Sequence, residues 1–166
     1  MKRALLALAT TMAATVLAGT GMAHADSQAT PKELITPTLY NVRIVDADGP
    51  FNADDILNLH DIVLTPQEIT PTHGASWTYG WCDDEVRVVG GIEAGMDSTG
   101  KPVGSSWIRL QEGTSGCPVT SLGLAVYGDT DLRIALNGRT ANSVKVKDDE
   151  GDSSQIDIFI DDQVIS

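Results

Sequence analysis

The sequence has few of the residues on which enzyme chemistry usually depends. Of its 166 residues, 5% are aromatic, three are histidine and two are cysteine. It contains no G-x-S-x-G nucleophile turn, no H-E-x-x-H zinc motif and no phosphate-binding glycine loop. These absences exclude a zincin and give no support to a serine hydrolase or a nucleotide-binding enzyme.

Positive charge is also scarce. Eleven Lys and Arg residues stand against 23 Asp and Glu, so the formal net charge is −12. Nucleic acids and anionic membrane surfaces are polyanions, and the acidic excess argues against both as partners. With 42% hydrophobic residues, the composition is typical of one small acidic soluble domain.

The first 25 residues have the pattern of a secretory signal peptide. Lys2 and Arg3 precede an uncharged apolar run over residues 4–20, and Ala23-His24-Ala25 supplies the small residues of a cleavage site. The run is short for a membrane span and has no positive charge on its far side. We expect residues 1–25 to be cleaved and the protein to be secreted to the extracellular space without a membrane anchor.

Cys82 and Cys117 are the two cysteines. In an exported chain an even pair usually forms a disulfide, and the sequence has no C-x-x-C motif that would favour a redox role. A bridge across the 34 intervening residues contributes roughly 3–4 kcal/mol by chain-entropy arithmetic. We predict a structural Cys82–Cys117 disulfide.

Apolar and polar residues alternate in several short segments, the pattern of half-buried strands. Residues 26–38 are rich in Ser, Thr, Pro, Gln and Lys and are predicted to form a flexible N-terminal arm. We expect a single domain over residues 39–166, an all-β antiparallel sandwich of about eight strands. The alternating segments are residues 40–44, 85–88, 106–111, 122–126, 132–136, 144–147 and 156–161.

Other local signals concern turns and one helical segment. Asn52 could cap a short helical turn near residues 53–60, followed by a strand, although Leu57 and Leu59 also fit a strand. Asn137-Gly138 and Gly128-Asp129 are predicted turns, and the acidic stretch 148–152 is predicted to close a hairpin. The Gly90-Gly91 pair suggests a β-bulge.

Acidic residues gather where loops are expected. Calcium takes six to eight oxygen ligands, often carboxylates that several loops bring together. Neither acidic cluster has the spacing of an EF-hand, so the alternative is a solvated acidic rim that keeps the protein soluble. The candidate Ca2+ ligands are Asp46, Asp48, Asp54, Asp83, Asp84, Asp148, Asp149 and Asp152.

The aromatic residues offer a second candidate site. Trp77, Tyr79 and Trp81 would project from one face of a strand. Such a row could stack on the apolar faces of sugar rings, but core packing is the plainer interpretation for so aromatic-poor a chain. Trp107 is the better candidate for an exposed aromatic, since it stands opposite Ile108 and Leu110 in its alternating segment.

The leading functional hypothesis is a secreted, acidic, non-catalytic binding or interaction domain for an extracellular protein or glycan, with Ca2+ in its acidic loops as one option. Two alternatives remain open. The protein could be a carbohydrate-binding module with an aromatic platform, or a small secreted hydrolase that uses paired carboxylates as acid and base.

Overall fold

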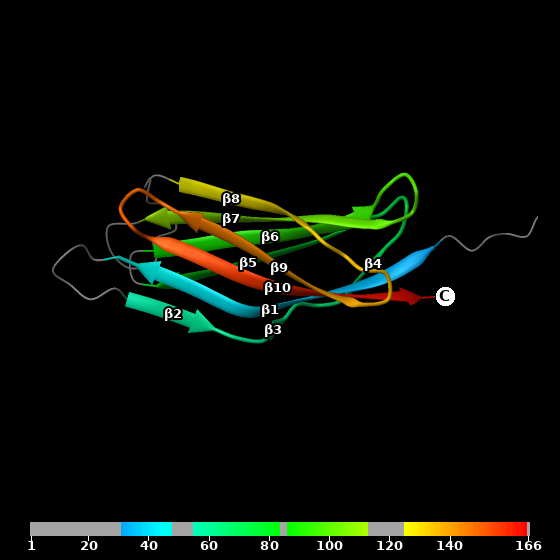
Figure 1. Ribbon diagram of the computed structural model, residues 1–166, viewed down its shortest axis with the longest axis horizontal. Coiled ribbons are helices and arrows are strands. Elements are labelled where there is room, and N and C mark those ends of the chain that lie inside the picture. The colour runs from blue at the N-terminus through cyan, green and yellow to red at the C-terminus, as the bar shows by residue number, and fades with distance from the viewer. Residues whose placement is uncertain (1–30, 48–54, 84–85, 113–124, 166) are drawn as a thin grey trace, which may run out of the picture.

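The computed structural model describes residues 31–47, 55–83, 86–112 and 125–165. These residues form ten strands in two antiparallel sheets, and no helix occurs among them. The two sheets lie one over the other as two layers of an elongated molecule (Figure 1). None of the described residues belongs to a helix with the length and apolar character needed to cross a bilayer.

The first sheet has six strands built around a long antiparallel pair, β1 and β10. Its main order is β2-β1-β10-β9, and the short strands β3 and β4 also pair with β1. Because β1 is 15 residues long, β2, β3 and β4 line up in succession along one edge of it. The strands are β1 (Lys32–Asp46), β2 (Asp55–Leu59), β3 (Ile62–Val63), β4 (Gln67–Ile69), β9 (Arg139–Lys147) and β10 (Ser153–Ile165).

The second sheet is a four-stranded meander, in which each strand pairs with the next along the chain. Its strands are β5 (Ala75–Asp83), β6 (Val86–Met96), β7 (Pro102–Glu112) and β8 (Ala125–Leu132). The chain then crosses to β9 of the first sheet. There the backbones of β8 and β9 come so close that a Cβ at Gly128 would collide with the carbonyl oxygen of Lys145.

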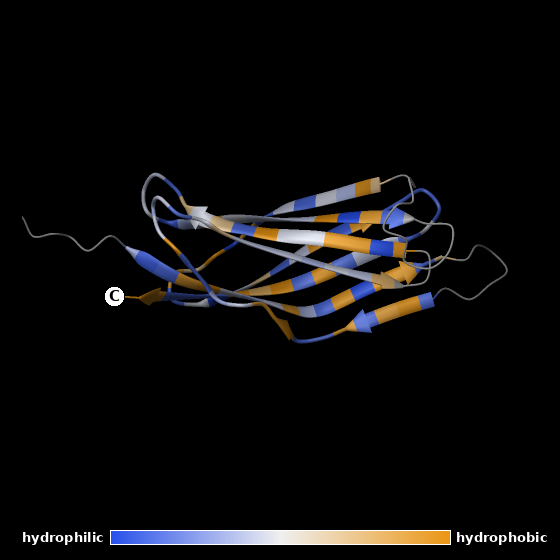
Figure 2. Cartoon of the chain, turned by 180° about the vertical axis from the view of Figure 1, so that it is seen from behind, coloured by the Kyte–Doolittle hydropathy of each residue, from blue (hydrophilic) through white to orange (hydrophobic). Residues whose placement is uncertain are grey.

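The core lies between the two sheets, and alternation along each strand supplies it. Apolar residues of one face pack inward while their neighbours face solvent, which gives the banded colouring of Figure 2. Each fully buried Ile or Leu contributes about 1.5–3 kcal/mol through burial. Fully buried side chains from the two sheets include Ile35, Leu39, Ile44, Ile156, Ile158 and Ile160 from one and Val86, Val88, Ile92 and Ile108 from the other.

The sequence-based strands over β1, β6, β7, β9 and β10 are confirmed, as are the all-β class and the turn at Asn137, which has a φ of 49°. The predicted helical turn near residues 53–60 is wrong from Asp55 onward, where β2 pairs with β1. Leu57 and Leu59 pack against the core from this strand. The open edge of β1 provides hydrogen bonds that a short isolated helix would lack.

Four other expectations differ from the structure. The strand predicted over residues 132–136 is wrong after Leu132, where β8 ends and the chain turns before β9. The predicted flexible arm over residues 26–38 is strand from Lys32, because β10 and β4 pair with this part of β1. The predicted turn at Gly128-Asp129 lies inside β8. The predicted bulge at Gly90-Gly91 is absent from β6, whose register with β5 and β7 is continuous.

Candidate binding face

The solvent-facing side of the four-stranded sheet, called the binding face below, combines aromatic, basic and acidic side chains. Figure 2 views the molecule from the side on which this sheet lies. The strand register places its residues in rows across β5, β6, β7 and β8. The rows are Ser76–Glu93–Ser105–Asp131, Thr78–Gly91–Trp107–Asp129, Gly80–Val89–Arg109–Tyr127 and Cys82–Arg87–Gln111–Ala125.

Trp107 lies across the neighbouring strand instead of projecting from the sheet. Gly91 is its partner on β6, and a Cβ at Gly91 would lie 2.6 Å from the indole Nε1 and 2.7 Å from Cε2. The ring therefore occupies the space that a side chain at Gly91 would fill. It remains half-buried, so part of the ring also borders solvent.

The adjacent glycine serves the opposite side of the sheet. A Cβ at Gly90 would collide with the ring of Tyr79, which is 8% exposed and part of the core. Its hydroxyl lies 3.5 Å from Ser106 Oγ, and burial raises its pKa to about 12. The glycine pair thus accommodates one aromatic ring on each face, which is why β6 needs two glycines and no bulge.

Two open hollows flank the Trp107 row. One, of about 570 Å3, is lined by five consecutive residues of β5 and two of β6: Thr78, Tyr79, Gly80, Trp81, Cys82, Arg87 and Val89. The other, of about 460 Å3, lies beyond the opposite side of that row and is lined by residues of β6, β7 and β8 that include Glu93, Ser105 and Asp131. Both volumes are within the range of small-ligand sites.

Two more side chains lie near Trp107 on the binding face. Tyr127 is 66% exposed on β8, diagonally across from Trp107. Arg109 stands beside it on β7, and its Nε is buried with no hydrogen-bond partner. A buried donor without a partner costs about 1–3 kcal/mol, while the Arg109 side chain as a whole is half-buried on this face.

The row of candidates Trp77, Tyr79 and Trp81 points the other way. Trp77 is 6% exposed and donates from Nε1 to the carbonyl of Thr65 at 2.6 Å, while Trp81 packs partly buried against the core and stacks on Tyr79 with ring centroids 5.4 Å apart. The core interpretation of this row is therefore the one that the structure favours. Of the four aromatic candidates, Trp107 is the one on the outer face.

The acidic candidates whose side chains are described lie at one end of the first sheet. Asp152 accepts from the backbone N of Ala47 at 2.8 Å, next to Asp46, and both carboxyl side chains are buried. Asp148 accepts from the backbone N of Glu150 at 3.0 Å and of Gly151 at 2.8 Å, which shapes the β9–β10 hairpin. Asp149 is exposed in the same turn.

Within the described residues, no three His, Cys, Asp or Glu side chains are grouped as metal ligands. Asp48, Asp54 and Asp84 lie outside those residues, as does the side chain of Asp83, so a calcium site stays a prediction. Cys82 lies at the end of β5, and Cys117 lies outside the described residues. Their disulfide also stays a prediction.

One pair of carboxyl groups does come together, and it was not a candidate. Glu33 and Asp162 are 2% and 5% exposed on β1 and β10. Burial, together with the charge of Asp162 and a hydrogen bond to it, raises the pKa of Glu33 to about 7, and burial also raises the pKa of Asp162. Asp162 Oδ2 accepts from the backbone N of Asn137 at 3.1 Å. Neither side chain lines a described hollow, so this pair has the position of a structural group.

No motif or pattern in the sequence marks Gly91, Arg109 or Tyr127 as part of a site. In the alternating segment 106–111, Arg109 falls on the same outward face as Trp107. The sequence alone could therefore have placed these two side chains together. The pairing of Trp107 with Gly91 depends on strand register, which the sequence alone does not give. Comparison with family models, with curated proteins and with solved structures finds no match to this chain.

Proposed function

We propose that this protein is a secreted, non-catalytic binding domain that holds a glycan along its binding face. The central observation is the placement of Trp107 flat across Gly91, between two open hollows on a polar sheet surface. A sugar ring has apolar C–H faces and a polar rim. A fixed aromatic surface with polar groups around it is complementary to both parts.

Each part of the binding face has a role in this proposal. Trp107 would stack on one sugar ring, and Tyr127 would contact the next. The half-buried guanidinium of Arg109 would donate to a ring or hydroxyl oxygen. The hollows would receive the flanking sugars, one beside Arg87 and the other beside Glu93 and Asp131.

Export and a disulfide also belong to the proposed function. Residues 1–25 would direct export, and the Cys82–Cys117 disulfide would hold the end of β5 that borders the larger hollow. This arrangement favours binding over hydrolysis, because the carboxyl pair seen among the described residues, Glu33 and Asp162, is buried away from the binding face.

The test is affinity electrophoresis of the purified protein in gels that contain neutral or acidic soluble polysaccharides. We expect retardation by at least one polysaccharide, weakened about three- to tenfold in Trp107→Ala, because a stacked aromatic contributes roughly 0.5–1.5 kcal/mol beyond its area. Tyr40→Ala is the matched control. Tyr40 stacks on Phe159 in the other sheet, with ring centroids 3.9 Å apart.

Gly91→Ala provides a second, independent variant, because it displaces the Trp107 ring without removing it. Thermal unfolding of each variant separates loss of binding from loss of fold. Retardation that is equal in the wild type, Trp107→Ala and Gly91→Ala would remove the binding face from the proposal. No retardation by any polysaccharide would favour a protein partner instead.

A further inference from the structure

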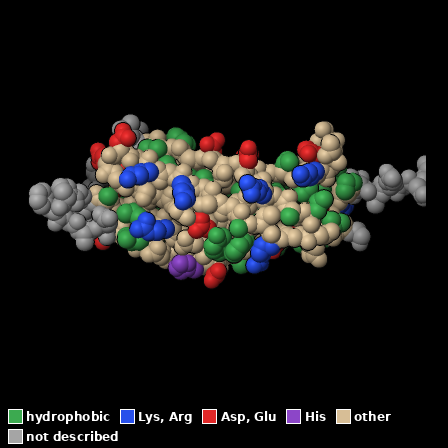
Figure 3. Space-filling model, viewed as in Figure 1, with side chains coloured by type: hydrophobic (Ala, Val, Ile, Leu, Met, Phe, Trp, Pro, Cys, Tyr) green, Lys and Arg blue, Asp and Glu red, His purple; other side chains and the backbone are tan. Residues whose placement is uncertain are grey.

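A second feature lies on the outer face of the other sheet. Three cationic residues, Arg43 of β1 and Lys145 and Lys147 of β9, line one hollow of about 270 Å3 and are called the basic cluster here. Figure 3 shows Lys and Arg side chains across this face, with acidic side chains mostly at its margins. Such a gathering is unexpected in a chain whose net charge is −12.

Strand register brings the cluster together. Gln155 of β10 lies between Arg43 on one side and Lys145 on the other, and Ser153 lies opposite Lys147 in the next row. Arg43 and Lys145 are two strand spacings apart, about 10 Å between backbones. Their long side chains can therefore reach one small ligand held above Gln155, and Gln155 and Ser153 also line the hollow.

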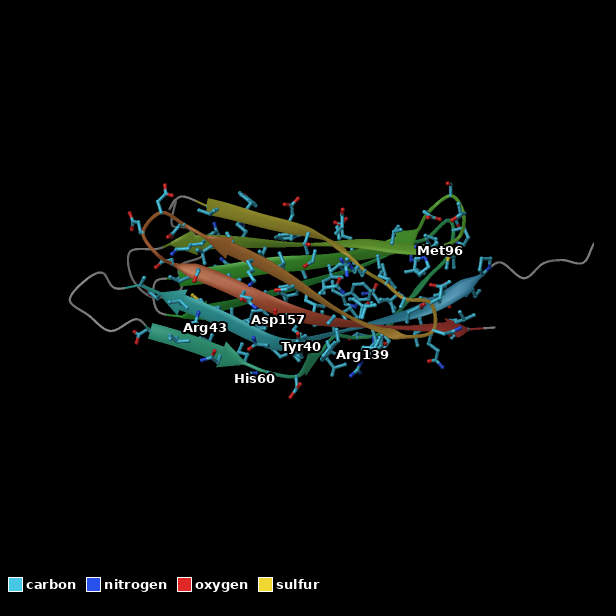
Figure 4. All side chains as sticks on the ribbon, in the orientation of Figure 1. Tyr40, Arg43, His60, Met96, Arg139 and Asp157 are labelled. Carbon is cyan, nitrogen blue, oxygen red and sulfur yellow. The ribbon has the colours of Figure 1, made fainter. Side chains whose placement is uncertain are left out.

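The cluster has little internal neutralisation. The ion pairs within 4 Å among the described residues are Lys32–Glu68 and Arg139–Asp161, and neither includes a cluster residue. Asp157, one row away on the same face, attracts Lys145. It also accepts from Asn41 at 2.9 Å and from Gln155 at 2.8 Å, so both of its oxygens are already engaged. Figure 4 labels Asp157 and Arg43 on this face of the molecule.

Edge protection explains only part of this arrangement. Lysines on an edge strand discourage pairing with another chain, which accounts for charge on β9. It does not account for Arg43, which lies on β1 inside the sheet between β2 and β10. The convergence of Arg43 with the two lysines on one hollow requires another reason.

We propose that the basic cluster binds a compact oxyanion, the phosphate or sulfate monoester group of a small molecule. The guanidinium of Arg43 supplies a planar fork for two oxygens, and the ammonium groups of Lys145 and Lys147 supply charge from the other side. A long polyanion fits less well, because Asp148, Asp149 and Glu150 follow directly after Lys147 in the hairpin and would repel its continuation. This site is independent of the glycan proposal, since it lies on the opposite sheet.

The test is a titration followed by amide NMR shifts, with inorganic phosphate, inorganic sulfate, an alkyl phosphate monoester and heparin as probes at constant ionic strength. We expect saturable shifts confined to the region of Arg43, Lys145–Lys147 and Ser153–Gln155. The Lys145→Gln/Lys147→Gln double variant and Arg43→Gln should each weaken binding roughly tenfold. Lys101→Gln, a charge change in the turn after β6, should leave it unchanged.

Asp157→Asn supplies a variant with the opposite effect. It removes the negative charge next to Lys145 and keeps a side chain of the same shape, so anion affinity should rise severalfold. Saturation by the small anions with these variant effects supports the proposal, and the comparison of phosphate with sulfate identifies the preferred group. Linear, non-saturating shifts mean an adventitious ion only and overturn it, as does saturable binding of heparin alone or equal binding by all variants.

Discussion

At the scale of single residues, Gly90 and Gly91 show how neighbouring positions on a strand serve opposite faces. The Tyr79 ring below Gly90 is enclosed by the core, whereas the Trp107 ring above Gly91 borders solvent. An added methyl group has the same volume at either position. Its cost should differ because one ring can move outward and the other cannot.

We therefore predict that Gly90→Ala lowers the free energy of unfolding by about 1–3 kcal/mol, the usual cost of overpacking a core. Gly91→Ala should cost less than about 1 kcal/mol, since Trp107 can rotate toward solvent. Urea denaturation of both variants checks the difference. Equal losses, or a larger loss in Gly91→Ala, would show that Trp107 is as firmly enclosed as Tyr79.

The buried carboxyl of Glu33 should make the stability of the protein depend on pH between mildly acidic and neutral conditions. The pKa of Glu33 is raised from 4.5 to about 7, with burial as the main cause. The folded state therefore holds a proton that the unfolded state releases between these pH values. The resulting stability is fully present below about pH 4.5 and is lost as the pH rises through about 7.

The variant Glu33→Gln should flatten this dependence. Between pH 4.5 and pH 8, we expect the wild type to lose about 2 kcal/mol of unfolding free energy relative to the variant. Glu68→Gln is the control, because Glu68 is an exposed glutamate paired with Lys32. Parallel pH curves for the wild type and Glu33→Gln would mean that the two carboxyls do not share a proton in the folded protein.

At the scale of elements, the sequence predicted the strands that bury one whole face. Alternation is clear in β1, β6, β7 and β10 because each packs apolar side chains on the core at every second position, and β9 does so at Val144 and Val146. The pattern is weak in β2, a short strand at the sheet edge whose Ile56 is 46% exposed. In this segment the alternation that favours a strand competes with Asn52, which favours a helical turn. Pairing with β1 decides in favour of the strand.

The candidate site was less predictable than the strands, for a physical reason. Trp107 could be placed on an outward face from alternation alone. Its contact with Gly91 and the convergence of Arg43 with Lys145 join residues of different strands, and a shift of one residue in register would undo both. The turn predicted at Gly128-Asp129 is wrong for a similar reason. Glycine is needed at position 128 because β8 and β9 approach closely there, and not because the chain turns.

That approach gives a prediction about how the two sheets join. Gly128→Ala would force a methyl group against the carbonyl oxygen of Lys145, and backbone cannot rotate away. We expect a loss of about 3 kcal/mol in unfolding free energy. Gly95→Ala is the matched control in β6, because a Cβ there meets nothing within 4 Å. A loss at Gly128 no larger than at Gly95 would mean that β8 and β9 separate easily.

At the scale of the whole molecule, the dominant property is the net charge of −12. Charges of one sign repel more strongly in a compact fold than in an extended chain, so the folded state carries a cost that salt reduces.

We predict that raising the sodium chloride concentration from about 0.02 to about 0.5 M increases the melting temperature by several degrees at pH 7. This step shortens the Debye length from about 20 to about 4 Å. Near pH 4.5, many carboxylates are protonated and the net charge approaches zero, so the same salt step should have little effect. A salt response of equal size at both pH values would indicate a specific ion effect instead of self-repulsion.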